Sequence, residues 1–228
     1  ELEEARDAVA QSGDTVVGLL RVAAPLSFLD YAAPALADLA KAHPRLKVEA
    51  SYSDARVDIV AERFDCAIRI GALPDSSLVA RRIAPIYGVL VATPDYLDRH
   101  GRPQTPADLG AHEFLIRHGL ETLRLQRGEV EVSVRTEGRF RADSGAALLR
   151  AALTGLGVAA LPTFMLHEAI VSGALEVVLP DYMFAPTALS LVRPPGPAPG
   201  KVRALTDLLI ERFGAQSLWD PCSLKLAP

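Results

Sequence analysis

Apolar residues along the first part of this chain alternate between the spacing of buried strands and the spacing of helices that cover them. The pattern predicts a strand at 16–23, a helix at about 28–42, a strand at 46–50, a helix at about 54–63 and a strand at 66–70. Strands that alternate with helices pair in parallel through right-handed crossovers. This order therefore predicts a βαβαβ unit with a mostly parallel sheet.

The second part of the chain continues the alternation. A strand at about 86–92 leads into Thr93-Pro94, where we place the first crossing into a second domain, and the runs at 129–134 and 135–140 fit antiparallel or edge strands. The other elements expected in sequence order are a strand at 114–117, a helix at 144–154, a strand at 158–161, a helix at about 162–171, strands at 175–178 and 189–192, and a helix at about 201–213. The fold class is therefore α/β, with two units.

Hydroxyl side chains stand at two of the expected passages from strand to helix. Ser27 follows the first strand, and Asp143-Ser144 precedes the helix of the second unit. The first turn of a helix leaves backbone N–H groups unpaired and carries a partial positive charge. Two such openings on one crevice suit a carboxylate or another small anion. The pattern indicates a ligand sensor and does not point to a reaction centre.

Composition narrows the classes of function. The 228 residues are 50% hydrophobic, enough for one large core or two modest ones. The formal charge of -4 argues against this chain gripping a nucleic-acid backbone by itself. No apolar run approaches the roughly 20 residues of a membrane span, and the opening residues 1–4 do not resemble a signal peptide. Unless a leader was removed, we therefore expect a cytoplasmic protein that does not act on membranes.

Cysteine, histidine and glycine patterns give no sign of metal, cofactor or catalysis. Cys66 lies in an apolar strand and Cys222 near the end of the chain, so we expect Cys66 to be a buried apolar residue without a structural disulfide. The five histidines lack the spacing of metal ligands. The glycine-rich run at 155–160 follows a helix and enters a strand, which is opposite to the order of a dinucleotide site. Residues 143–145 lack the glycine spacing of a nucleophile elbow.

Many ordered stretches of the chain resemble the effector-binding region of LysR-type transcriptional regulators. The resemblance covers about residues 14–213 and is carried by Gly18-Leu19-Leu20-Arg21-Val22-Ala23-Ala24-Pro25-Leu26-Ser27-Phe28, Ala42-His43-Pro44, Val57-Asp58-Ile59-Val60 with Phe64-Asp65, Ile68-Arg69-Ile70-Gly71, Pro74-Asp75-Ser76-Ser77-Leu78-Val79-Ala80-Arg81, Ala92-Thr93-Pro94-Asp95-Tyr96-Leu97, Pro106-Ala107-Asp108-Leu109 and Gly155-Leu156-Gly157-Val158-Ala159-Ala160-Leu161-Pro162. It implies two Rossmann-like lobes of the periplasmic-binding-protein type (type 2), joined by two crossing strands, with a small organic effector in the cleft between them.

The resemblance also implies an organisation and a set of partners. Residues 1–13 would end a linker helix, 14–92 with 193–214 would form lobe I, 93–192 would form lobe II, and 215–228 would be a tail without an assigned role. In such regulators a winged helix-turn-helix precedes the linker, and no basic recognition helix is present here. Promoter DNA would be bound by that N-terminal domain, within a homo-oligomer that is a dimer and, in the intact protein, a tetramer.

Four candidate effector contacts lie in the first lobe. Ser27 can either cap its own helix or reach the effector, and the resemblance favours the effector. Arg69 interrupts an apolar strand, so its charge requires a structural ion pair or a ligand. Ser76 and Ser77 follow a Pro-Asp turn, where they can donate to a ligand or only cap the turn.

The remaining candidates are expected at the crossing and in the second lobe. Thr93 can contact a ligand between the lobes, or it can cap the short helical stretch that begins at Pro94. Ser144 opens the helix of lobe II, while the adjacent Asp143 would repel an anion if it were ionised and turned inward. Pro162 and Thr163 mirror that opening after the next strand, and Phe164 can either form an apolar wall or pack in the core.

The leading hypothesis is therefore the effector-sensing domain of a LysR-type regulator, which is not an enzyme. A solute-binding protein of a transport system shares the architecture and is the alternative, and an enzyme on the same scaffold is a third. The hydroxyl-rich candidates and an aromatic content of 6% favour a small, hydrogen-bonding, anionic effector over a large flat ring.

Overall fold

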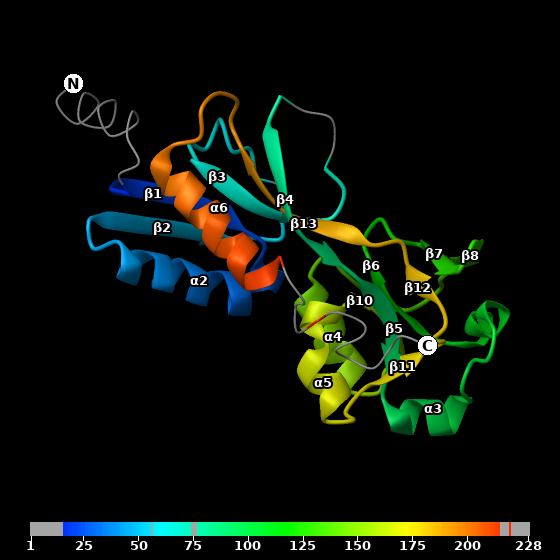
Figure 1. Cartoon of the computed structure of the whole chain (residues 1–228). Helices are drawn as coiled ribbons and strands as arrows, with labels where there is room; N and C mark the ends of the chain where they lie inside the picture. The colour runs from blue at the N-terminus through cyan, green and yellow to red at the C-terminus, as the bar shows by residue number, and fades with distance from the viewer. Residues whose placement is uncertain (1–15, 56, 74–76, 215–218, 220–228) are drawn as a thin grey trace. The chain divides into compact units, whose positions relative to one another are not determined.

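The computed structural model describes residues 16–55, 57–73, 77–214 and 219 (Figure 1). The expected linker helix at 1–13, the candidate Ser76, Cys222 and all of the tail except Trp219 lie outside the described residues. The chain divides into two compact units, one formed by residues up to Pro85 with Ala188–Ala215, the other by Ile86–Thr187 with the residues from Gln216 onward.

Unit 1 is built on a five-stranded sheet in the order β2-β1-β3-β13-β4. Its strands are β1 (Gly18–Ala24), β2 (Leu46–Tyr52), β3 (Cys66–Ile70), β4 (Val79–Ile86) and β13 (Thr187–Arg193). β1 lies parallel to both β2 and β3, as the sequence predicts, and β13 joins antiparallel to β3. The helices α2 (Leu29–Ala42) and α6 (Gly200–Phe213) pack against each other, with α2 against β2 and α6 against β1.

The expected helix at 54–63 is wrong, because this connection is a series of turns. Oδ1 of Asp58 accepts hydrogen bonds of 3.0 Å from the amides of both Val60 and Ala61. Arg63 then adopts a left-handed φ of 57°. A carboxylate that accepts from these two amides caps the start of a helical turn, but the left-handed Arg63, next to the 2.9 Å hydrogen bond from the amide of Phe64 to the carbonyl oxygen of Ile59, ends it before a helix extends. The apolar spacing was therefore that of a packed loop, whose Ile59 is buried against Ala23 and Ala67.

Unit 2 contains a five-stranded sheet in the order β11-β5-β10-β6-β9. The strands are β5 (Gly88–Ala92), β6 (Phe114–Arg117), β9 (Phe140–Ala142), β10 (Val158–Pro162) and β11 (Glu176–Val178). β10, β6 and β9 run parallel, while β5 is antiparallel to β10 and β11. Both faces are buried, since Leu90 and Ala92 enter one apolar cluster and Val89 and Val91 the other.

Helical elements surround this sheet. In sequence order they are α3 (Pro94–His100), the 3-10 turn η2 (Pro106–Ala111), α4 (Gly145–Leu153), the 3-10 turn η3 (Thr163–Met165) and α5 (His167–Val171). α4 packs against β5, β6, β9 and β10, which places it over the middle of the sheet. The sequence predicted α4 well, but it merged η3 and α5 into one helix.

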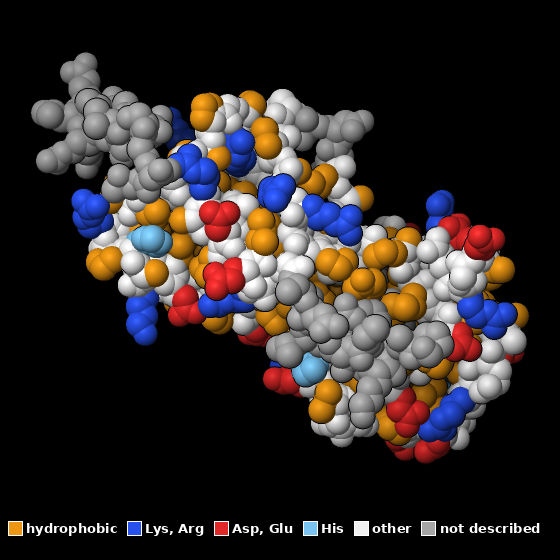
Figure 2. All heavy atoms as spheres, in the orientation of Figure 1, with side chains coloured by type: hydrophobic (Ala, Val, Ile, Leu, Met, Phe, Trp, Pro, Cys, Tyr) orange, Lys and Arg blue, Asp and Glu red, His pale blue; other side chains and the backbone are white. Residues whose placement is uncertain are grey.

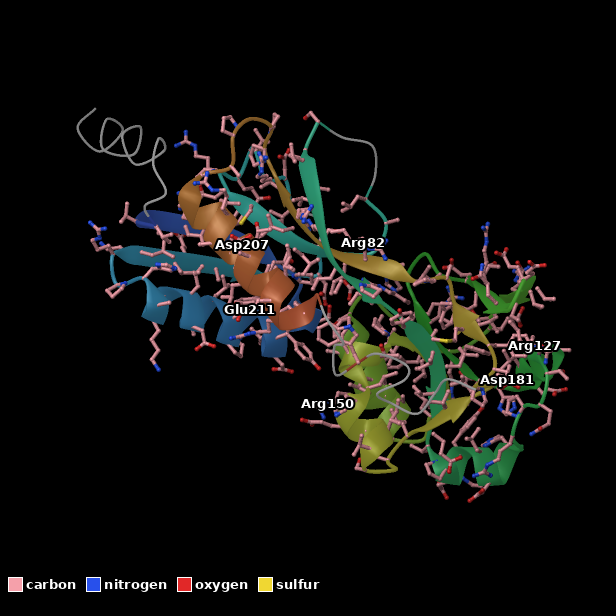
Figure 3. All side chains as sticks on the ribbon, in the orientation of Figure 1. Arg82, Arg127, Arg150, Asp181, Asp207 and Glu211 are labelled. Atoms are coloured by element: carbon pink, nitrogen blue, oxygen red, sulfur yellow. The ribbon has the colours of Figure 1, made fainter. Side chains whose placement is uncertain are left out.

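A small second sheet in unit 2, in the order β12-β7-β8, corrects another expectation. β7 (Thr122–Arg127) and β8 (Val130–Arg135) form a hairpin whose tip includes Gly128 at φ 60°, and β12 (Met183–Phe184) pairs with β7. The run at 135–140 is therefore not one strand. Arg127 extends from this hairpin, with its guanidinium carbon 5.0 Å from the ring centre of Tyr182, next to Asp181 (Figure 3).

The boundaries between the units differ from those expected at 92/93 and 192/193. The chain passes from unit 1 to unit 2 between Pro85 and Ile86, and it returns between Thr187 and Ala188. Strand pairing explains the shift, because residues 88–92 belong to the sheet of unit 2 and residues 189–192 pair with β3 of unit 1. An isolated apolar strand does not reveal from its own pattern which of two sheets it joins.

Candidate functional site

Strand direction determines which loops meet at one edge of the sheet in unit 1. Because β1, β2 and β3 are parallel, the residues that follow their carboxyl ends gather there. These residues are Pro25–Ser27 after β1, Ser53 and Asp54 after β2, and Gly71 after β3. We call this the unit 1 edge. It carries the first candidate, Ser27.

Ser27 lies in the 3-10 turn η1 (Leu26–Phe28), which leads into α2. Its amide donates a hydrogen bond of 3.1 Å to Oδ1 of Asp54. Helix α2 begins after Phe28 without a side-chain cap, so the alternative that Ser27 only caps this helix is wrong. The side chain of Phe28 anchors the turn, because it stacks on Tyr31 at 5.2 Å and meets Phe213 edge to face at 5.6 Å.

The other candidates of unit 1 have different environments. Nη2 of Arg69 in β3 donates a hydrogen bond of 2.7 Å to the carbonyl oxygen of Val57, which ties the partly buried guanidinium to the turn-rich connection. Ser77 is exposed in the link between β3 and β4. Arg69 thus has a structural role in unit 1, and the effector contacts of Arg69 and Ser77 stay predictions.

The corresponding edge of unit 2 lies at the carboxyl ends of β10, β6 and β9. Residues that follow these strands include Thr163 after β10, His118 after β6 and Ser144 after β9. The antiparallel β5 presents its amino end here, with Gly88 opposite Pro162. We call this the unit 2 edge. Three of the candidates, namely Ser144, Pro162 and Thr163, meet at it.

Ser144 is the N-cap residue of α4, with extended backbone angles of φ -100° and ψ 126°. The next residue, Gly145, is buried against η3, because a Cβ built on it would stand 3.1 Å from the sulfur of Met165. A side chain at this position would require the end of the Met165 side chain to shift. The first turn of α4 and the turn after β10 therefore lie side by side.

Thr163 begins η3 and is fully buried, with 0% of its surface exposed. Its amide donates to the carbonyl oxygen of Tyr87 at 2.9 Å, and its hydroxyl donates to the carbonyl oxygen of Trp219 at 2.7 Å. Phe164 is buried too, and its ring meets that of Trp219 edge to face at 6.2 Å. Of the two interpretations of Phe164, the structure supports packing in the core.

Thr93 lies at the opposite edge of the same sheet. Since β5 and β10 are antiparallel, the end of β5 at Ala92 is remote from the end of β10 at Pro162. Oγ1 of Thr93 accepts a hydrogen bond of 3.2 Å from the amide of Tyr96 and so caps α3. The expectation that Thr93 lies at a crossing between the units is therefore wrong, and the capping interpretation is confirmed.

Sequence reasoning missed three residues at the two edges. The carboxylate of Asp54 accepts a hydrogen bond from the amide of Ser27. The carbonyl oxygen of Tyr87 accepts from the amide of Thr163, and that of Trp219 accepts from the hydroxyl of Thr163. Asp54 carried a usable signal, because an acid directly after a parallel strand reaches the loops after neighbouring strands. Trp219 is the only tryptophan in the chain, and its size favours burial.

The described residues contain neither a metal-binding group of three His, Cys, Asp or Glu side chains nor a helix that could span a membrane. On the face shown in Figure 2, Lys and Arg side chains are interspersed with Asp and Glu. Such mixing is not the concentrated basic surface typical of nucleic-acid binding.

The family model for the LysR substrate binding domain matches residues 13–214. The chain belongs to this family. It is 34% identical over 198 residues to an HTH-type transcriptional regulator of Haemophilus influenzae, an alignment that covers 85% of this chain and 69% of that protein. It is 35% identical over 191 residues to the HTH-type transcriptional regulator YhjC of Escherichia coli, covering 81% of this chain and 64% of the relative.

Solved LysR-type structures share the fold. The full-length virulence activator AphB of Vibrio cholerae superposes with a TM-score of 0.78 at 27% identity, covering 92% of this chain and 73% of AphB. The regulatory domain of CrgA from Neisseria meningitidis superposes with a TM-score of 0.75 at 25% identity, covering 87% of this chain and 100% of that domain. These findings confirm the expected two-lobe fold of the periplasmic-binding-protein type.

The chain is an effector-sensing domain of a LysR-type transcriptional regulator, and the transport alternative is not favoured. These relatives are transcriptional regulators and not enzymes.

Proposed function

We propose that the unit 1 edge and the unit 2 edge enclose one effector site and that its occupancy modulates transcription by the intact regulator. The observation that carries this proposal is the placement of Ser27, Ser144, Pro162 and Thr163, all chosen from sequence, at the carboxyl edges of the two sheets. Ligands of open α/β sheets bind at such edges, where helices begin. The role of each residue in binding is part of the proposal.

The effector that we propose is a small organic anion, with its charge at the unit 2 edge. The first turn of α4 after Ser144 provides backbone donors and a partial positive charge there. The unit 1 edge differs, because the carboxylate of Asp54 already accepts the hydrogen bond that the amide of Ser27 donates. An anionic group would be repelled by Asp54, so hydroxyl or amine groups of the effector suit the unit 1 edge.

The regulatory step that we propose is a shift between arrangements of the two units. An effector that contacts both edges binds one arrangement better than another and so changes their populations. A coupling free energy of about 1 to 3 kcal/mol is typical of such regulation. In the intact protein the change would reach the DNA-binding domains through the linker.

The partners that we propose follow from the family. The chain spans 69% and 64% of the lengths of the two relatives named above, which are HTH-type regulators. We propose that promoter DNA is bound by an N-terminal domain outside this chain, in a homo-oligomer that is a dimer or a tetramer, in the cytoplasm where the promoter lies. A net charge of -4 is consistent with a sensing region that leaves DNA contacts to another domain.

A thermal-shift screen tests the proposal. The chain would be heated with small carboxylates, amino acids and aromatic acids, because a ligand that binds only the folded state raises the unfolding temperature. We expect a saturable rise with at least one carboxylate, and we expect this rise to disappear in a folded variant that combines Ser27→Ala and Ser144→Ala. A rise of equal size in this double variant would place the binding site elsewhere.

A further inference from the structure

Trp219 lies at the unit 2 edge, although the preceding helix α6 belongs to unit 1. The indole is only 1% exposed, and its plane lies at 70° to the ring of Phe164 in an edge-to-face contact. Phe213, six positions earlier in the chain, is buried in unit 1 at the end of α6. Two buried aromatic residues that are six positions apart in sequence therefore belong to different units.

The hydroxyl of Thr163 has one proton, and the carbonyl oxygen of Trp219 accepts it at 2.7 Å. The other acceptor near Oγ1 is the carbonyl oxygen of Tyr87 at 3.4 Å, which is beyond the usual range for O–H···O hydrogen bonds. The amide of Thr163 is also engaged, by that same Tyr87 oxygen. Because a hydroxyl donates a single hydrogen bond, a ligand that requires this proton has to take it from Trp219.

We propose that Trp219 is a latch on the effector site, by which we mean the hydrogen bond from Thr163 together with the buried indole. Trp219 is docked when its carbonyl oxygen accepts the proton of the Thr163 hydroxyl. A carboxylate that accepts the same proton cannot bind at the same time. This inference rests on the proposed function, since it takes Thr163 as an effector contact. A carboxylate is a stronger acceptor than an amide carbonyl, so an effector anion displaces the Trp219 oxygen.

Tryptophan fluorescence tests the latch without any effector, because Trp219 is the only tryptophan. Thr163→Val removes the proton and keeps the shape of the side chain. Losing one hydrogen bond shifts the ratio of docked to released Trp219 by about fivefold, so we expect a clear rise in quenching by acrylamide. Thr163→Ser keeps the hydroxyl and retains the quenching of the native chain. Tyr96→Phe, a control that removes a buried hydroxyl at the opposite edge, leaves quenching unchanged. Unchanged quenching in Thr163→Val overturns the latch.

Calorimetry with succinate, glutamate and benzoate tests the competition. We expect at least one probe to bind Trp219→Ala about fivefold more tightly than the native chain, because the competing acceptor is no longer held in place. Truncation after Gly214 is the second variant, and circular dichroism establishes that each variant is folded. Equal affinity for both chains sustains the proposed function and overturns the latch. Weaker binding to Trp219→Ala also overturns it, because Trp219 then supports the site. If neither chain binds any probe, both the carboxylate site and the latch are wrong.

Discussion

The turns that end β1 and β10 have the same backbone design and differ in what holds them. In each turn a proline with nearly identical angles, φ -63° and ψ 138° at Pro25 and φ -64° and ψ 141° at Pro162, leads into a 3-10 turn with a hydroxyl residue and a buried phenylalanine. The turn of unit 1 is held by the carboxylate of Asp54 within the same βαβ unit. In the turn of unit 2 the amide of Thr163 donates to the carbonyl oxygen of Tyr87, and its hydroxyl donates to a neutral carbonyl of Trp219, 56 residues away in sequence.

This difference shows how one local design can serve two purposes. A charged acceptor on a neighbouring loop makes a strong, local restraint that an anionic ligand does not readily replace. A neutral carbonyl on a distant segment is a weaker restraint that a ligand can replace. The comparison predicts that unit 1 provides the rigid side of the effector site and unit 2 the responsive side.

The largest effect is expected from the phenylalanines that anchor the two turns. Phe28→Ala removes a fully buried ring that contacts Tyr31 and Phe213, so the free energy of unfolding should fall by about 3 to 5 kcal/mol. Phe164→Ala should cost less, because its ring partner Trp219 leaves the unit 2 edge in the proposed latch. Urea unfolding measures both changes. An equal or larger loss for Phe164→Ala would contradict the assignment of unit 1 as the rigid side.

Next in size is the loss of the acceptor that holds the unit 1 turn. Asp54→Ala leaves the amide of Ser27 without this charged acceptor, and the free energy of unfolding should fall by about 1 to 3 kcal/mol. Asp54→Asn keeps an acceptor oxygen and should cost clearly less. The same urea experiment decides this, and equal losses for the two variants would show that the charge of Asp54 has no role.

Thr163→Val tests the matching restraint in unit 2, where the acceptor is neutral. The free energy of unfolding should fall by about 0.5 to 1.5 kcal/mol, which is the range for a hydrogen bond between neutral groups. Thr163→Ser is the control that keeps the hydrogen bond. A loss larger than that of Asp54→Ala would reverse the order of the two restraints.

Acidification should have the smallest effect, and it should act on unit 2. Burial, and to a lesser degree the charge of His100, lower the pKa of His112 from its usual value of 6.5, while Asp108 opposes the shift. The hydroxyl of Tyr96 accepts from the amide of Glu113 and lies 3.3 Å from Nδ1 of His112, where it can donate only to a neutral ring.

The sign of the pH dependence follows from this shift. The unfolded chain binds a proton at His112 more readily than the folded chain, so the stabilising effect of the neutral ring is complete above pH 6.5 and is lost as the pH falls toward the lowered pKa. The unfolding temperature of the native chain should fall more between pH 7 and pH 5 than that of His112→Asn, which retains an uncharged side chain at this position. Parallel pH profiles of the two chains would contradict this role of His112.

Most of the strands and the long helices were predicted from the sequence, because these elements depend on local apolar spacing. The parallel pairing of β1 with β2 and β3, the helices α2 and α6, and the burial of Cys66 were all predicted correctly. Burial also raises the pKa of the Cys66 thiol to about 12. The turn at 58–63 was missed because Arg63 adopts a left-handed φ that ends the segment before a helix extends, which apolar spacing does not register.

Features that depend on distant partners were the ones that sequence could not provide. Thr93 and Ser144 both precede helices and look alike in sequence, yet the antiparallel entry of β5 puts Thr93 at the other edge of the sheet. The contact between Thr163 and Trp219 joins residues 56 positions apart, and no local pattern encodes such a pairing. The two edges themselves followed from strand direction, which the βαβ order did predict for unit 1.

The most direct test of the account is calorimetric titration of a carboxylate found in the thermal-shift screen into the native chain, Ser144→Ala and Thr93→Ala. Both substitutions remove the hydroxyl of an N-cap residue in unit 2, one at the proposed site and one at the opposite edge. We predict that Ser144→Ala weakens binding by about 0.5 to 2 kcal/mol, as expected for one lost hydrogen bond, while Thr93→Ala leaves the affinity unchanged. Unchanged affinity in a folded Ser144→Ala chain, or an equal loss in Thr93→Ala, would contradict the assignment of the effector to the unit 2 edge.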